Sequence, residues 1–219
     1  MIKEFKISMP FYKIAYAVFF VIILSLVRGV SLSCEVGIAL EPPMAILVAA
    51  FCADTYASEI AGKRSEVWRL YPMKKRLYSI GMRMIIQELF LLLLTAGGYG
   101  LFFFFQKPQL SMEAGSETTQ FFVFLASSLV TNVFWGIFSN TIACIFRSMW
   151  FGIGGSLILW ILTFSTLGDR YLGKWNVLSY TFRSIENNGD FSWLAGKGVC
   201  FALCIVMAVM LPYILKKRG

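Results

Sequence analysis

The side chains that could carry out chemistry are few in this sequence. It contains no histidine, which excludes Ser-His hydrolases, His-ligated zinc proteases and haem held by histidine. The five cysteines are odd in number and most of them lie in apolar stretches, so neither a disulfide framework nor a metal site is indicated. Only scattered carboxylates remain as candidates for catalysis. We therefore expect that the chain is not an enzyme, with a membrane-embedded enzyme as a minor alternative.

A phosphate-binding loop of the Walker type is also missing. Gly62-Lys63 is followed by Arg64, and Ala57 stands where the motif needs its first glycine. We expect no cofactor on this chain. If it uses ATP, a partner ATPase must hold both the ATP and its Mg²⁺.

Some ionisable residues lie within or beside the apolar stretches, where such a group is a candidate site by default. Glu88 falls several residues into one stretch, and Asp54 lies near the end of another. Both are possible residues of a translocation path. For Glu88, the neighbouring Arg83 and Gln87 favour an ion pair at the membrane interface instead.

Arg28 is the basic counterpart of these acids, near the end of the first apolar stretch. Its long side chain can extend to the membrane surface. It can also pair with Glu35 or Glu41. A third possibility is that it binds an anionic substrate on the translocation path.

A line of polar residues runs along a fourth apolar stretch. Ser128, Asn132, Trp135 and Ser139 follow one another at helical spacing and therefore share one face. Polar side chains in a membrane span usually form hydrogen bonds to neighbouring helices. Helix packing is the favoured interpretation for this face, and substrate contact is the alternative.

The elements that must position these residues are membrane helices. Of the 219 residues, 58% are hydrophobic and 15% are charged, against about 25% charged in a typical soluble domain. A helix needs about 20 apolar residues to cross a membrane. The sequence predicts an all-α integral membrane protein with a single transmembrane domain and these six spans: 11–30, 40–60, 80–105, 121–146, 149–167 and 198–215.

The distribution of basic residues predicts the orientation of the spans. Most lysines and arginines fall near the two ends of the chain and between the second and third spans, so both termini are expected in the cytoplasm. Ile2, Phe5 and Met9 share a helical face, which predicts a short amphipathic helix in the membrane interface. The basic residues expected on the outer side are Lys107, Arg170, Lys174, Arg183 and Lys197.

The basic connection between the second and third spans reads GKRSEVWRLYPMKKRLYS over residues 62–79. Ile60, Val67 and Tyr71 are spaced as one face of a helix, and Pro72 must end that helix. One interpretation is a topogenic loop whose lysines face anionic lipid. The other is a docking element for a cytoplasmic partner.

The second interpretation is favoured by a resemblance. The order of residues over 59–76, between the second and third of six spans, resembles the coupling region of the ABC type-2 permease family. In that family a short helix here rests in a groove on the ATPase and transmits its closure. Lys63 departs from the family pattern, in which many members have a small polar residue. The resemblance implies that the ATPase-coupling residues are Glu59, Gly62, Lys63, Glu66, Val67, Leu70, Tyr71, Pro72, Lys75 and Arg76.

Residues 169–194 form the longest outer segment and mix aromatic with charged side chains. Taken alone, they are typical of an interfacial loop with aromatic anchors. The resemblance implies short, partly re-entrant helices that close the outer exit before the last span.

The resemblance therefore implies the permease subunit of an ATP-driven ABC exporter in a cell membrane, expected to be the bacterial cytoplasmic membrane, with no nucleic-acid partner. The family pattern implies two copies of the chain and two ATPase subunits. The apolar composition favours a hydrophobic or amphipathic substrate, such as an antimicrobial or toxin-like peptide or a lipid-like molecule. The main alternative is the vitamin-binding membrane subunit of an energy-coupling-factor importer.

Overall fold

The computed structural model describes residues 2–60, 68, 70–109, 117–183 and 191–218. Apart from an isolated bridge between Leu32 and Gln109, these residues form helices and the turns between them, so the expected all-α class is confirmed. The helices are α1 (Ile2–Ser8), α2 (Phe11–Val27), α3 (Glu35–Cys52), α4 (Asp54–Ile60), α6 (Met73–Gln106), α7 (Glu117–Phe146), α8 (Met149–Phe164), α9 (Thr166–Leu172), the 3₁₀ helix η1 (Gly173–Trp175) and α10 (Trp193–Arg218).

Among the described residues, four helices are long and apolar enough to cross a membrane: Glu35–Glu59, α6, α7 and α10. A fifth span is possible if α8 and residues 166–175 are taken together, although they are bent by 72°. The apolar helix α2 has 17 residues. It ends before Arg28, whose extended backbone caps the helix, so Arg28 lies beyond the helix rather than inside a span as the sequence predicted.

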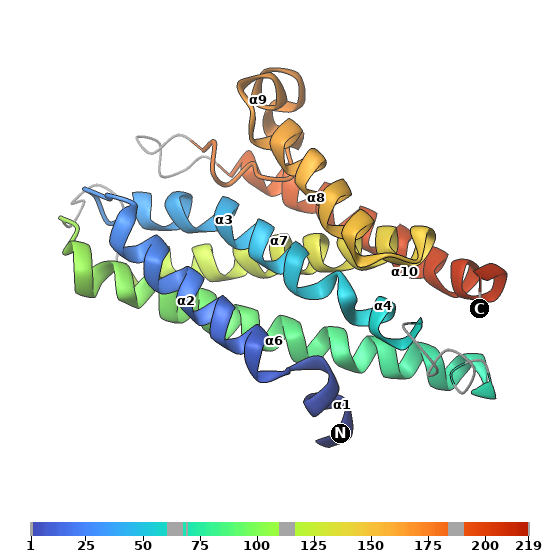
Figure 1. The fold of residues 1–219 in the computed structure, drawn as a ribbon. Helices are drawn as coiled ribbons and strands as arrows, with labels where there is room; N and C mark the ends of the chain where they lie inside the picture. The colour runs from blue at the N-terminus through green and yellow to red at the C-terminus, as the bar shows by residue number, and fades with distance from the viewer. Residues whose placement is uncertain (1, 61–67, 69, 110–116, 184–190, 219) are drawn as a thin grey trace.

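Helix α3 is the centre of the bundle and α10 lies at its edge (Figure 1). In the apolar window of each, 78% of the α3 span is buried within the protein, against 17% for α10. Helix α3 packs against α6, α7 and α8. Close packing of α8 on α7 depends on Gly152, because a Cβ atom there would lie 2.7 Å from the Ser139 carbonyl oxygen.

The two ends of the bundle differ in charge. Both chain termini lie toward the same end as the start of α6, while the turn between α2 and α3 lies at the other (Figure 1). We call the first the basic end, because it carries Lys74, Lys75, Arg76 and Lys216. The other is called the opposite end.

Helix α6 is longer than a membrane requires. Its 34 residues correspond to about 51 Å at 1.5 Å per residue, whereas a hydrocarbon core is about 30 Å thick. It begins directly after Pro72 rather than at residue 80, since a proline is well tolerated at a helix start. The basic first turns of α6 therefore extend beyond the apolar part of the bundle.

After α8, the described residues up to 180 turn back onto the bundle. Ser165 ends α8 and caps α9 by accepting a hydrogen bond from the Gly168 backbone at 3.1 Å. Residues 176–180 are non-helical yet buried. They are fixed by Asn176, whose Nδ2 donates to the Thr163 carbonyl at 2.8 Å, and by Ser179, whose hydroxyl donates to the Trp193 carbonyl at 2.8 Å.

Candidate functional site

Three acidic side chains are buried in the described part of the bundle: Glu41, Glu59 and Glu88. Burying a carboxylate without a partner costs several kcal/mol or more, so the partners of each acid indicate its role. The three lie on different helices and their surroundings differ.

Glu59 belongs to an ion cluster at the basic end, which we call the Arg83 cluster (Glu4, Glu59, Ser79 and Arg83). Nη1 of Arg83 pairs with Glu59, and its Nε pairs with Glu4 of α1 at 2.5 Å. The Ser79 hydroxyl donates to the other oxygen of Glu4 at 3.0 Å. This cluster joins α1, α4 and α6 through one guanidinium group whose side chain is 4% exposed.

A second ion pair lies near the start of α2. Lys13 is 3% exposed, and its ammonium group pairs with Asp54 and donates to the Phe51 carbonyl at 2.8 Å. Asp54 therefore joins α2 to the junction between α3 and α4. Next to it, the Thr55 hydroxyl donates to Gln87 Oε1 at 2.8 Å.

The residues predicted to couple to an ATPase are only partly described. Gly62, Lys63, Glu66 and Val67 lie outside the described residues. Leu70 is 84% exposed.

Around Pro72 the described coupling residues contact one another. The Tyr71 carbonyl accepts a hydrogen bond from Arg76 Nε at 2.9 Å, and the Lys75 ammonium lies 4.4 Å from the centre of the Tyr71 ring. Unlike these residues, Glu59 points into the protein.

Glu41 belongs to a larger polar cluster toward the opposite end, the Glu41 cluster (Glu41, Ser127, Thr131, Thr181 and Lys197). Lys197 of α10 forms an ion pair with Glu41 of α3, and their side chains are 5% and 1% exposed. The hydroxyls of Thr131 and Thr181 each donate to the Glu41 carboxylate at 2.7 Å. A longer bond of 3.4 Å comes from Ser127.

The ammonium group of Lys197 has an acceptor for each of its three hydrogens. It has three hydrogens to donate, and three acceptors surround it: the Glu41 carboxylate, the Thr131 hydroxyl at 2.6 Å and the Val177 carbonyl at 3.3 Å. The cluster thus connects α3, α7, α10 and the segment 176–181, of which residues 176–180 are buried.

Sequence reasoning missed this cluster. It placed Lys197 among the outer loop residues and considered Glu41 only as a partner of Arg28. The pairing of Arg28 with Glu41 is wrong, since Lys197 holds that carboxylate. Glu35 accepts the backbone N–H groups of Ser31 and Leu32 at 3.2 Å each. The sequence offered one signal for this cluster: Glu41 and Lys197 are each followed within a few residues by an apolar stretch.

Glu88 has the least complete surroundings of the three acids. Its Oε1 accepts a weak contact of 3.9 Å from the Cys52 thiol, and its Oε2 is buried without a hydrogen-bond partner. The predicted ion pair between Glu88 and Arg83 is wrong, because Arg83 is occupied by Glu4 and Glu59. Gly136 leaves room for the carboxyl group, since a Cβ atom there would collide with Oε1.

The polar face of α7 contacts other helices, as its spacing predicted. The Ser139 hydroxyl donates to the Ala49 carbonyl of α3 at 2.7 Å, and Asn132 Nδ2 lies 3.5 Å from the Thr95 hydroxyl of α6. The Ser128 hydroxyl is buried without a partner. Interhelical bonding therefore accounts for Ser139 and for the amide nitrogen of Asn132, whereas the Asn132 Oδ1 is buried without a partner.

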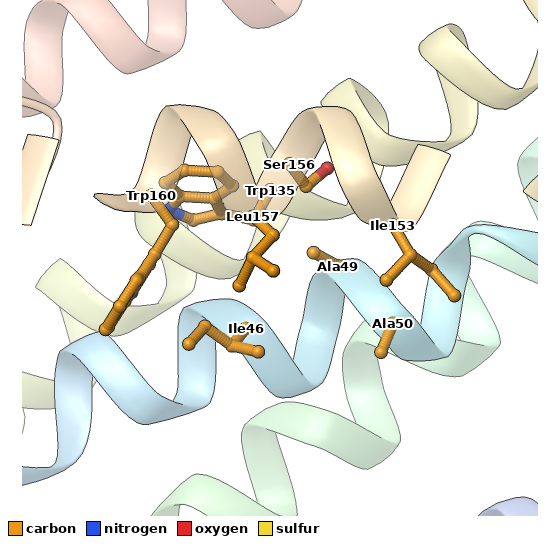
Figure 2. A pocket seen from close by; sticks show the side chains of 8 residues that line it. All are labelled: Ile46, Ala49, Ala50, Trp135, Ile153, Ser156, Leu157 and Trp160. Atoms are coloured by element: carbon orange, nitrogen blue, oxygen red, sulfur yellow. The ribbon is translucent and has the colours of Figure 1, made fainter. Parts of the chain in front are cut away.

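A small cavity lies between α3, α7 and α8 (Figure 2). Its volume of about 20 Å³ is enough for a single water molecule and too small for a substrate. Trp135 and Ser156 line it, and the Nε1 of the first and the hydroxyl of the second are buried without protein partners.

The described residues form an all-helical protein, and its long apolar helices indicate that it is embedded in a membrane. No protein-family model, curated protein or solved structure matches the chain.

Proposed function

We propose that this chain is the permease subunit of an ATP-driven exporter of the ABC type-2 class. The observation that carries the proposal is the Arg83 cluster. Glu59, at the end of α4, is the first residue of the segment that resembles a coupling region, and Arg83 ties it to both α1 and α6. A displacement of that segment would reach two further helices through buried charges.

The shape of α6 fits the same role. The basic start of α6 extends beyond the apolar bundle. Leu70 and Tyr71, which directly precede this helix, are exposed. A long helix that is rigid along its axis carries a push from its end into the membrane. In this mechanism, ATP binding closes a partner ATPase dimer and moves the start of α6, and hydrolysis resets it.

The full assembly would contain two copies of this chain, each crossing the cell membrane six times with both ends in the cytoplasm, and two ATPase subunits. Helix α2 and the bent α8–α9 unit would supply the two spans beyond the four long helices. Residues 176–180 would close the outer side. Their non-helical backbone is buried in protein, and at membrane depth such backbone is tolerated only there or beside a water-filled cavity.

The substrate would be hydrophobic or amphipathic. Much of the bundle surface consists of exposed apolar side chains, including Phe201, Val209 and Ile158. A peptide with toxin-like or antimicrobial character fits such a surface better than a small hydrophilic ion does.

The vitamin-binding subunit of an energy-coupling-factor importer is the second candidate, and the Glu41 cluster is the observation that favours it. Such a subunit would gather polar side chains toward the outer half. Here Glu41, Thr131 and Lys197 bond to one another, so they hold helices together. The permease therefore remains the first candidate.

The test is to extract the tagged chain in mild detergent, identify what co-purifies and measure ATP hydrolysis with and without the chain. We expect a stoichiometric ATPase with a Walker motif. Glu59→Gln keeps the size of the side chain and removes the negative charge that pairs with Arg83. We expect this variant to transport several-fold less substrate per ATP hydrolysed. Glu117→Gln, an exposed site on α7, is the matched control. A chain that purifies alone and stably would overturn the proposal.

A further inference from the structure

An apolar groove lies between α6 and α7 beside Glu88. Its volume is about 270 Å³, close to the lower limit of about 300 Å³ for small-molecule sites. Ile85 and Leu89 are 56% and 57% exposed, so the groove opens on the surface of the bundle. The lining residues are Met84, Ile85, Glu88, Leu89, Leu92, Leu129, Val133 and Ile137.

Glu88 is the only charged residue in this lining, and it is 9% exposed. Of the three buried acids described above, Glu41 and Glu59 each hold a cation. Glu88 has one oxygen with a weak thiol contact and one with no partner. A buried carboxyl group in this condition either takes up a proton and becomes neutral or is matched by a cation or a donor from outside the described chain.

We propose that the groove is a binding site for an apolar molecule that carries a primary ammonium group, and that the Glu88 carboxylate accepts this group.

The accessible lining of the groove is apolar, and the Glu88 carboxyl group lies beside Cys52 and Gly136. Rotation of the Glu88 side chain, whose terminal torsion is broad, would have to bring an oxygen from that position to the groove when a ligand binds. The other lining residues are aliphatic and contact the body of the ligand. A single fixed charge would select an ammonium over an anion, and the apolar walls would select a ligand whose remainder is hydrocarbon.

This inference rests on the proposed export function for its purpose, because the bound molecule would be the exported substrate or the part of it that carries the amine. It names a cationic amphiphile as the substrate class. The binding test contains no ATPase, so its failure is distinguishable from failure of the permease assignment.

The experiment uses the full chain in nanodiscs of phosphatidylcholine and a photoreactive probe, an aliphatic diazirine with a primary ammonium group. A probe of the same length with a hydroxyl group in place of the ammonium is the chemical control. After illumination, mass spectrometry locates the labelled peptides. We expect the ammonium probe to label residues 84–92 and 129–137 of the wild-type chain.

Glu88→Gln should reduce this labelling at least about tenfold, since a hydrogen bond between two charged groups contributes about 1.5 kcal/mol or more. Glu117→Gln should leave it unchanged. Equal labelling by the ammonium and hydroxyl probes would overturn the proposal and indicate a carboxyl group that binds only a proton. Labelling that persists in Glu88→Gln would also overturn it.

Competition on the wild-type chain gives a result that does not depend on the folding of a variant. Unlabelled octylamine should displace the ammonium probe, whereas octanol at the same concentration in the membrane should not. Displacement by both to the same extent would show that the groove takes any alkyl chain, and the role of Glu88 would be refuted.

Discussion

Glu41 and Glu88 are both glutamates inside the helical bundle, but their surroundings differ in how completely they are satisfied. Glu41 has a lysine and hydroxyl donors from three other parts of the chain. Glu88 has a thiol contact and an unpartnered oxygen. A satisfied buried network holds one arrangement of helices, whereas an unsatisfied group is available to a ligand.

The largest effect on stability should come from a substitution in the Glu41 cluster. Lys197→Met removes the ammonium and leaves the Glu41 carboxylate as an uncompensated buried charge. We expect a loss of about 3–5 kcal/mol in the free energy of unfolding, measured by titrating the detergent-solubilised protein with a denaturing detergent. Lys174→Met, an exposed site in η1, is the matched control. Equal stability of the two variants would contradict a structural role for the pair.

The double variant Glu41→Leu with Lys197→Met sharpens the same comparison. Replacing both members of a buried ion pair by apolar residues is often neutral, so the double variant should recover most of the stability that the single variant loses. If it also folds yet no longer transports, the pair has a role in the transport cycle that stability does not explain.

A smaller loss is expected at the basic end. Arg83→Met leaves Glu4 and Glu59 without their shared cation, but the Glu4 side chain is 27% exposed and solvent screens it. We expect a loss of about 2 kcal/mol together with faster hydrogen exchange in α1, whose contacts with α6 include this ion pair. Lys74→Met, exposed in the first turn of α6, is the control. Unchanged exchange in α1 would mean that Arg83 does not hold that helix.

The difference between Glu41 and Glu88 also shows which features of the protein can be predicted from its sequence. Apolar length and composition were enough for the all-α class, but they placed the start of the third span at residue 80 instead of directly after Pro72, because the first turns of α6 are basic and not apolar. The partners of Glu41 could not be predicted, since Lys197 is far away in the chain and the pairing depends on how α3, α7 and α10 pack. For Glu88 the nearby Arg83 was misleading, because along a helix residues five apart do not face one another.

The smallest effect on stability is expected at Glu88, and it separates the two glutamates most directly. Glu88→Gln keeps the shape of the side chain and removes a carboxylate that has no cation, so the free energy of unfolding should change by no more than about 1 kcal/mol, in the direction of a gain. Glu41→Gln makes the same chemical change but leaves Lys197 buried without its counter-charge, and it should lose clearly more. Both variants are compared in one denaturing-detergent titration. If Glu88→Gln lost as much as Glu41→Gln, Glu88 would be a structural residue like Glu41, and a ligand would no longer be needed to explain its unpartnered oxygen.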